Sequence, residues 1–230
     1  MIPGVDHHNT HVATAVVVTG GLILLSLAGR AVLGTGEKAV MPAGKLSIKG
    51  LFEALIEFNV GLGEMVLGSH GRKFVPLFAS VFTFILVNNL VGLVPGMTPA
   101  TDNFNTTFAV GIFSFLVYNI VGIKEKGFRY LEDFTGHLPI TFFWLMPLML
   151  VIELLSHAFR PVSLGLRLAG NMTGDHAVLG VFLELLPAPF VYFVPMIFYV
   201  LGLLVCFIQA FVFTLLSMAY VMMAQAHDDH

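Results

Sequence analysis

The chain has 230 residues, of which 57% are hydrophobic and only 11% are charged, and its formal net charge is −3. Soluble domains carry about 25% charged residues, so this composition predicts an all-α integral membrane protein. The slightly acidic balance and the lack of a basic cluster argue against nucleic acid as a partner, and the single cysteine, Cys206, leaves no disulfide framework.

Apolar segments separated by polar turns predict one polytopic membrane domain over residues 1–230. The uncharged run from Val12 to Gly29 is just long enough to span a bilayer. A later segment that begins near Lys49 is amphipathic and too charged to span, so we expect it to lie along the membrane interface. The predicted segments are a first span over 12–30, the interfacial helix over 46–69, spans over 74–95 and 106–123, and two long apolar segments over 138–186 and 190–224. The segment 138–186 is long enough for two spans or for one very long tilted helix.

The positions of the basic residues predict the topology. After Arg129 the only Lys or Arg residues are Arg160 and Arg167, and all the others fall in the segments 30–73 and 124–129. Cytoplasmic loops carry an excess of Lys and Arg, which puts those two segments inside. The N-terminus and the turn over 95–105 are then outside. If 138–186 crosses once, the turn at Pro187 is also outside, and five crossings leave the C-terminus in the cytoplasm.

Motifs for soluble catalysis are missing from the sequence. It has no GxxxxGK[ST] phosphate loop, no HExxH, and no Cys/His spacing suited to zinc, so we expect no cofactor, no metal and no catalysis by the chain alone. Three N-terminal histidines, His7, His8 and His11, are more typical of a polar tail than of a metal site. Transport of a small ion is the function class that remains.

The segment Glu153–His176 carries one polar stripe through an apolar body. On a helix of 100° per residue, its polar and glycine positions share an arc of roughly 120°. They are Glu153, Ser156, His157, Arg160, Ser163, Arg167, Asn171, Gly174 and Asp175.

An arginine within an apolar segment of a membrane protein requires a physical explanation. A charged side chain at the bilayer centre costs about 2.5–3.5 kcal/mol on insertion scales, and guanidinium groups do not shed their proton in proteins. Arg167 therefore predicts a functional site with an anionic partner or a water-filled cavity. The alternative is a structural ion pair with Glu153 or Asp175 that ties helices together.

Small residues surround Arg167, namely Gly165, Ala169, Gly170 and Gly174. Small residues at this spacing let another helix approach closely. One interpretation is a partner helix that bears a carboxylate. The other is packing against helices of the same chain.

Four motifs in order resemble subunit a of the rotary, F-type, proton-translocating ATP synthase, and the resemblance covers about residues 46 to 225. The motifs are NNLVGLVPG (Asn88–Gly96), TPATDNFNTT (Thr98–Thr107), RPVSLGLRLAGNM (Arg160–Met172) and IQAFVFTLLSMAY (Ile208–Tyr220).

This resemblance implies a stator subunit in a membrane such as the bacterial inner membrane. Its partners would be the ring of c subunits, the peripheral-stalk b subunits, the other ATP synthase subunits and the lipid bilayer. Arg167 matches the essential arginine of the family, which would attract each ring carboxylate and separate two aqueous half-channels, so that proton flow is coupled to ring rotation and ATP synthesis. The resemblance also implies that the segments 138–186 and 190–224 form a long, steeply tilted C-terminal helical hairpin that faces the ring.

The resemblance also implies which residues of this chain line the path of the protons, because they match positions of the family. The inner half-channel would involve Glu153 and Ser156. The outer half-channel would involve Asn89, Asn103, Asn105, Asn171, His176 and Gln209.

The sequence departs from the family at the acid that partners His176. Many members carry that acid at the position of Gly202, and some carry a polar or acidic residue at the position of Gly92. Here either Asp175 or Glu184 supplies the acid, or His176 and water suffice, since a histidine with a pKa near about 6.5 can relay protons.

Three alternatives stay open at this stage. A secondary transporter could use Arg167 to bind a small anionic substrate, although such proteins often have internal repeats and none is visible here. A sodium-coupled version of the same stator is also compatible with the sequence. A purely structural scaffold would leave the isolated arginine unexplained.

Overall fold

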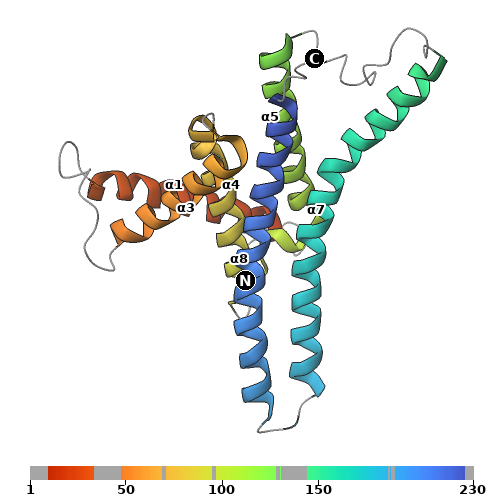
Figure 1. Cartoon of the computed structure of the whole chain (residues 1–230). Helices are drawn as coiled ribbons and strands as arrows, with labels where there is room; N and C mark the ends of the chain where they lie inside the picture. Colours follow the sequence, from red (N-terminus) through yellow and green to blue (C-terminus); the bar gives the residue numbers. More distant parts are fainter. Residues whose placement is uncertain are drawn as a thin grey trace.

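The computed structural model describes residues 10–33, 48–68, 71–94, 97–127, 130, 144–185, 187 and 190–225. All regular structure in these residues is helical (Figure 1). The helices are α1 (Thr10–Leu33), α3 (Ile48–Leu67), α4 (Gly71–Gly92), the short 3-10 turn η3 (Ala100–Asp102), α5 (Phe104–Lys126), α7 (Met146–Leu185) and α8 (Phe190–Gln225).

Some predicted features lie outside the described residues. They are residues 46–47, 69, 95, 138–143 and 186 of the predicted segments, the histidines His7 and His8, and the basic residues Lys38, Lys45 and Arg129.

Five of the helices, α1, α4, α5, α7 and α8, are long and apolar enough to cross a membrane. This finding confirms the prediction of an all-α integral membrane protein with five crossings. Within the described part of the chain α3 is not one of the five, and its charged face forms ion pairs. Lys49 Nζ lies 3.6 Å from Glu53 Oε1, and Arg72 Nε at the start of α4 lies 2.7 Å from Glu64 Oε1.

The two longest helices, α7 and α8, form an antiparallel hairpin that is the long axis of the molecule (Figure 1). Helices α1 and α3 extend to one side of this hairpin, and α1 lies across its long axis in this view. The N-terminal end of α7 diverges from α8 in this view, and α7 packs against α5 around Pro161 and Gly165.

Close backbone contacts hold α5 against α7. A Cβ atom at Gly111 would lie 2.6 Å from the carbonyl oxygen of Pro161, and one at Gly165 would lie 3.0 Å from the Cα atom of Phe108. Only glycine allows backbones to approach so closely. The contact fixes the rotation of α7 about its own axis, and hence the direction in which its polar stripe faces.

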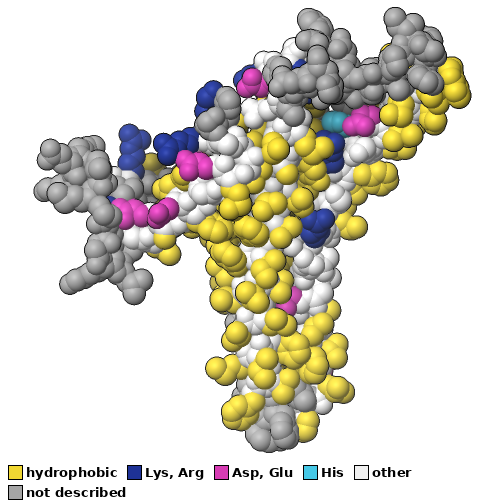
Figure 2. Space-filling view, viewed as in Figure 1, with side chains coloured by type: hydrophobic (Ala, Val, Ile, Leu, Met, Phe, Trp, Pro, Cys, Tyr) yellow, Lys and Arg dark blue, Asp and Glu magenta, His cyan; other side chains and the backbone are white. Residues whose placement is uncertain are grey.

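The core lies where α3, α4, α5, α7 and α8 meet. Phe82 and Ile85 of α4 pack there with Leu168 of α7 and Phe213 of α8, and all four side chains are buried. The outer surfaces of the helices are apolar, as expected for lipid-facing helices, while most of the charged side chains visible in Figure 2 gather in the upper half of the molecule.

Candidate functional site

Arg167 lies on the exposed face of α7. Within the residues that the structure describes, no acid lies within 4.0 Å of its guanidinium. Glu153 is instead paired with His157, and the carboxylate of Asp175 lies against Gly202. The geometry therefore does not support the alternative in which Arg167 is tied to either acid of its own helix.

The glycines near Arg167 divide into two groups. A Cβ atom at Gly165 would contact α5, whereas one at Gly170 or Gly174 would meet nothing within 4 Å. Packing within the chain therefore explains Gly165 alone. Gly170 and Gly174 leave an open, closely approachable face beside Arg167.

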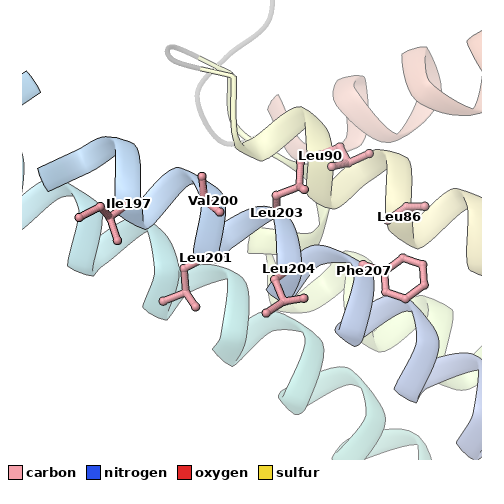
Figure 3. A pocket seen from close by; sticks show the side chains of 8 residues that line it. All are labelled: Leu86, Leu90, Ile197, Val200, Leu201, Leu203, Leu204 and Phe207. Atoms are coloured by element: carbon pink, nitrogen blue, oxygen red, sulfur yellow. The ribbon is translucent and has the colours of Figure 1, made fainter. Parts of the chain in front are cut away.

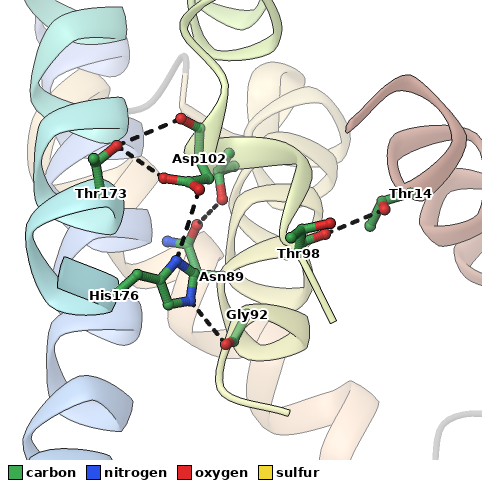
Figure 4. Close-up of polar contacts among 8 residues, drawn as sticks. Thr14, Asn89, Gly92, Thr98, Asp102, Thr173 and His176 are labelled. Carbon is green, nitrogen blue, oxygen red and sulfur yellow. Dashed lines mark hydrogen bonds and ion pairs between the residues drawn. The ribbon is translucent and has the colours of Figure 1, made fainter. Parts of the chain in front are cut away.

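Beyond Arg167, toward the C-terminal end of α7, polar side chains from three elements meet (Figure 4). His176 Nε2 lies 2.9 Å from the carbonyl oxygen of Gly92, and His176 Nδ1 lies 3.9 Å from Asp102 Oδ2. Thr173 Oγ1 donates to Asp102 Oδ1 at 2.8 Å. We call Asn89, Thr101, Asp102, Thr173 and His176 the Asp102 cluster.

Asn89 and Thr101 are the most buried members of the Asp102 cluster, and among the described residues Asn89 has an unsatisfied donor. Its Oδ1 accepts a hydrogen bond of 2.8 Å from Thr101 Oγ1, and both residues are fully buried. Its Nδ2 has no hydrogen-bond partner in the described part of the chain. Buried polar groups in proteins are nearly always paired with protein or water, so this donor marks a place suited to a water molecule.

The acid beside His176 is not one of the two that the sequence suggested. Asp175 occupies the space that Gly202 leaves open, because its Oδ2 lies 2.9 Å from the point where a Cβ of residue 202 would be. Glu184 is exposed near the end of α7. Among the described acids, the carboxylate within ion-pair distance of His176 belongs to Asp102.

Asn171 and Gln209 join the two helices of the hairpin. Asn171 Nδ2 donates to Gln209 Oε1 at 2.6 Å, one turn of α7 beyond Arg167. Asn103 has a different role, since its Oδ1 accepts from the backbone N–H of Asn105 and caps the start of α5. That cap is a sufficient local reason for an asparagine at position 103, and the Asn105 side chain is exposed.

A second polar cluster lies on the other side of Arg167, toward the N-terminal end of α7. His157 is buried, with Nδ1 2.9 Å from the hydroxyl of Tyr118 and Nε2 3.2 Å from Glu153 Oε1. The guanidinium of Arg160 lies over the rings of both Tyr118 and Tyr220. We call these five residues the Tyr118 cluster. Ser156, which the sequence assigned to the same side, is exposed on α7.

Several contributors were missed by the interpretation of the sequence. Asp102, Thr101 and Thr173 belong to the Asp102 cluster, and Tyr118 and Tyr220 belong to the other. The only signal for Asp102 was its place in the turn motif that precedes Asn103. Tyr118 and Tyr220 lie in apolar runs, and aromatic residues there are unremarkable.

An apolar pocket of about 830 Å³ lies between α4 and α8, away from both clusters (Figure 3). Leu86 and Leu90 line one side, and apolar residues of α8 from Ile197 to Phe207 line the other. It offers no polar group that could bind an ion. Within the described residues there is also no group of three or more His, Cys, Asp or Glu side chains that could hold a metal.

The chain matches a known protein family over nearly its whole length. The family described as "ATP synthase A chain" matches residues 11–222. ATP synthase subunit a of Bdellovibrio bacteriovorus is 56% identical over 229 residues, which cover 99% of this chain and 96% of that protein. The subunit a proteins of Trichlorobacter lovleyi and Geobacter sulfurreducens are 45% and 42% identical, over 91% and 87% of this chain and 86% and 82% of their own lengths. The chain belongs to the ATP synthase subunit a family.

Proposed function

We propose that this chain is the proton-conducting stator subunit of an ATP synthase and works beside a ring of c subunits. The family is a non-catalytic component of the ATP synthase complex. In the proposed mechanism Arg167 separates two aqueous half-channels and attracts each ring carboxylate as it passes. Proton flow through the half-channels then turns the ring and drives ATP synthesis.

The observation that carries the proposal is the state of Arg167. Its guanidinium lies on the exposed face of a membrane-spanning helix, and no acid in the described part of the chain lies within 4.0 Å of it. A fixed cation in a bilayer without a counter-ion is costly, so an anion from another subunit is the expected partner. The open glycine face at Gly170 and Gly174 gives a partner helix room to bring a carboxylate close.

The two polar clusters support separate entry and exit routes. At 1.5 Å of rise per residue, His176 lies about 14 Å beyond Arg167 along α7, and Glu153 lies about 21 Å before it. The Asp102 cluster, together with Asn171 and Gln209, would line the outer half-channel. Glu153 and Ser156 would lie along the inner one.

Coupling between proton flow and rotation is electrostatic. A carboxylate in hydrocarbon is costly unless it is neutralised, so a ring carboxylate is ionised only while it faces Arg167 or water. It takes a proton from the outer half-channel before it enters the lipid. It loses that proton when it reaches the inner half-channel.

The orientation and the remaining partners follow from the same proposal. The N-terminus lies outside and the C-terminus lies in the cytoplasm of a bacterial inner membrane. The peripheral-stalk b subunits hold the chain still while the ring turns. The ion is a proton in this proposal, and a sodium-coupled variant would be recognised by pumping that depends on Na⁺.

The decisive experiment compares wild type, Arg167→Ala and Ser163→Ala in the complete complex, reconstituted in vesicles. Ser163 is exposed on the same stripe and serves as the matched control. We expect Arg167→Ala to abolish ATP-driven proton pumping with normal assembly, and to raise the passive proton leak once the catalytic head is removed. The Ser163→Ala complex should pump like wild type.

Pumping by Arg167→Ala near the wild-type rate would overturn the mechanism. A secondary transporter predicts the opposite behaviour, namely substrate uptake by the isolated chain in vesicles without any ring. The isolated wild-type chain is therefore measured alongside, and we expect it to transport nothing.

A further inference from the structure

Arg160 is a second cation of helix α7, which is long and apolar enough to cross a membrane, and the mechanism above gives it no role. It lies in α7 on the same stripe as Arg167. Its guanidinium carbon is 5.5 Å from the ring centroid of Tyr118 and 5.2 Å from that of Tyr220. Within the described residues no acid lies within 4.0 Å of it.

The two tyrosine rings come from different helices, lie next to each other, and both contact the guanidinium. Tyr118 of α5 and Tyr220 of α8 have ring centroids 5.9 Å apart. Contacts of this kind between a cation and an aromatic face are attractive, and they are stronger when the site is shielded from water. They fix the position of Arg160 without neutralising its charge, as a carboxylate partner would.

Further contacts fix the position of the Tyr118 ring. Tyr118 is only 1% exposed, and its hydroxyl lies 2.9 Å from His157 Nδ1. The opposite ring nitrogen of His157 lies 3.2 Å from Glu153 Oε1. Because these residues belong to α5 and α7, the position of the Tyr118 ring is set by the packing of two helices.

The distance between Arg160 and Arg167 suggests that the two cations have different roles. Arg160 precedes Arg167 by seven residues, which is two helical turns or about 10.5 Å along α7. It lies toward the proposed inner half-channel, where ring carboxylates must lose their protons. At about 10 Å and an effective dielectric constant of 20, a unit charge still acts appreciably on a carboxylate.

We propose that Arg160, held in place by its contacts with Tyr118 and Tyr220, is a second functional cation. It promotes proton release on the inner side because its charge favours the ionised form of the ring carboxylate there. The proton passes to water of the inner half-channel, and no bond of the chain is made or broken. Tyr118 and Tyr220 are positioning residues for Arg160. This inference rests on the proposed stator function.

Other titratable groups face the same region and must be considered in the test. They are Glu153 and His157 on α7, Tyr118 on α5 and Tyr220 on α8. Their contribution is kept constant by variants that leave them intact. A change of the pH profile in an Arg160 variant then reports on the charge of Arg160.

The test measures ATP synthesis by reconstituted complete complex while the cytoplasmic-side pH is varied and the outer pH is held. Loss of Arg160 weakens proton release, so a higher inner pH is needed to ionise the carboxylate. We expect Arg160→Gln to move the acid limb of the pH profile upward by about 1 pH unit, the size of a Coulomb interaction over about 10 Å at an effective dielectric constant of 20. Arg160→Lys, which keeps the charge, and Tyr220→Phe, which keeps the ring, should stay close to wild type.

A lower rate in Arg160→Gln without any shift of the profile would overturn the proposal and leave Arg160 as a packing residue. If that complex does not assemble, Tyr220→Leu is measured in its place. An upward shift of the acid limb of its pH profile supports the proposal that the tyrosines position Arg160, and an unchanged pH profile overturns that proposal. The stator function is judged separately by Arg167→Ala. A functional Arg167→Ala complex would refute the stator mechanism, whereas an unshifted Arg160→Gln profile beside an inactive Arg167→Ala refutes the present inference alone.

Discussion

At the scale of single residues, the main surprise is the acid that accompanies His176. Glycine occupies position 202, and the neighbouring Asp175 extends into the space beside it. Asp102 reaches His176 from η3 instead, while Thr173 orients its carboxylate through a hydrogen bond of 2.8 Å. A histidine and an acid are therefore still brought together, but the acid comes from a different element (Figure 4).

Asp102→Asn tests whether this acid serves the outer half-channel. The amide keeps the shape and the hydrogen bond from Thr173 but cannot accept and pass on a proton. We expect ATP-driven proton pumping to fall about tenfold or more, since positioned acid–base groups typically contribute at least that much. The measurement is the initial rate of vesicle acidification at equal amounts of assembled complex.

Thr14→Val is the matched control for that variant. Thr14 donates to the carbonyl oxygen of Thr98, in the loop that precedes η3, at 3.2 Å, but lies outside the Asp102 cluster. It should leave pumping unchanged. Wild-type pumping by Asp102→Asn would mean that His176 relays protons with water alone.

Individual side chains were easier to predict than their pairing. Asn171, Gln209 and His176 each stood out as polar groups in apolar helices. Nothing in the sequence indicated that Asn171 bonds Gln209, because 38 residues and a turn separate them. For the same reason the sequence did not indicate that Asp102 lies beside His176, since contacts between distant segments depend on how the helices rotate and pack.

At the scale of helices, the contact between α5 and α7 decides how the stripe is presented. Gly111 and Gly165 face Pro161 and Phe108, so each helix places a glycine against the backbone of the other. Hydropathy predicted both helices, because long apolar runs must form helices in lipid. It could not predict this contact, since apolar residues look alike on every face of a lipid-exposed helix.

Gly111→Ala tests the contact directly. The added methyl group would lie 2.6 Å from the carbonyl oxygen of Pro161, and a backbone atom in a helix cannot move aside easily. Overpacking of this kind costs about 1–3 kcal/mol. We expect a lower thermal unfolding temperature of the detergent-solubilised complex, together with reduced pumping.

Gly61→Ala in α3 is the companion substitution. A Cβ atom there meets nothing within 4 Å, and alanine favours the helix over glycine, so stability should be equal or slightly higher. If Gly111→Ala matched Gly61→Ala in unfolding temperature, the close approach of α5 and α7 would be wrong.

At the scale of the whole molecule, the distribution of charge and the helix directions give one consistent orientation. The described loop from Met97 to Asn103 carries no Lys or Arg, whereas α5 ends at Lys124 and Lys126. The excess of Lys and Arg in cytoplasmic loops therefore predicts that α5 starts outside and ends in the cytoplasm. Gly127 ends the helix with a φ of 60°, a conformation that suits glycine.

Labelling of single cysteines tests this orientation. Cys206, the one native cysteine, is buried and would be replaced by alanine. Thr98 and Glu125 are both exposed, one on each side of the predicted span formed by α5. In the assembled complex, a membrane-impermeant maleimide should label Thr98→Cys in intact cells and Glu125→Cys only in inverted vesicles.

The pattern of labelling also bears on the mechanism, because the direction of proton flow depends on which cluster faces which side. Phe78→Cys, at a position 2% exposed, is the control that should stay unlabelled in both preparations. Labelling of Glu125→Cys from outside would show that the chain has the opposite orientation in the membrane. The Asp102 cluster would then belong to the exit route, and Arg160 would lie on the entry side, where a fixed positive charge opposes protonation of the ring carboxylate.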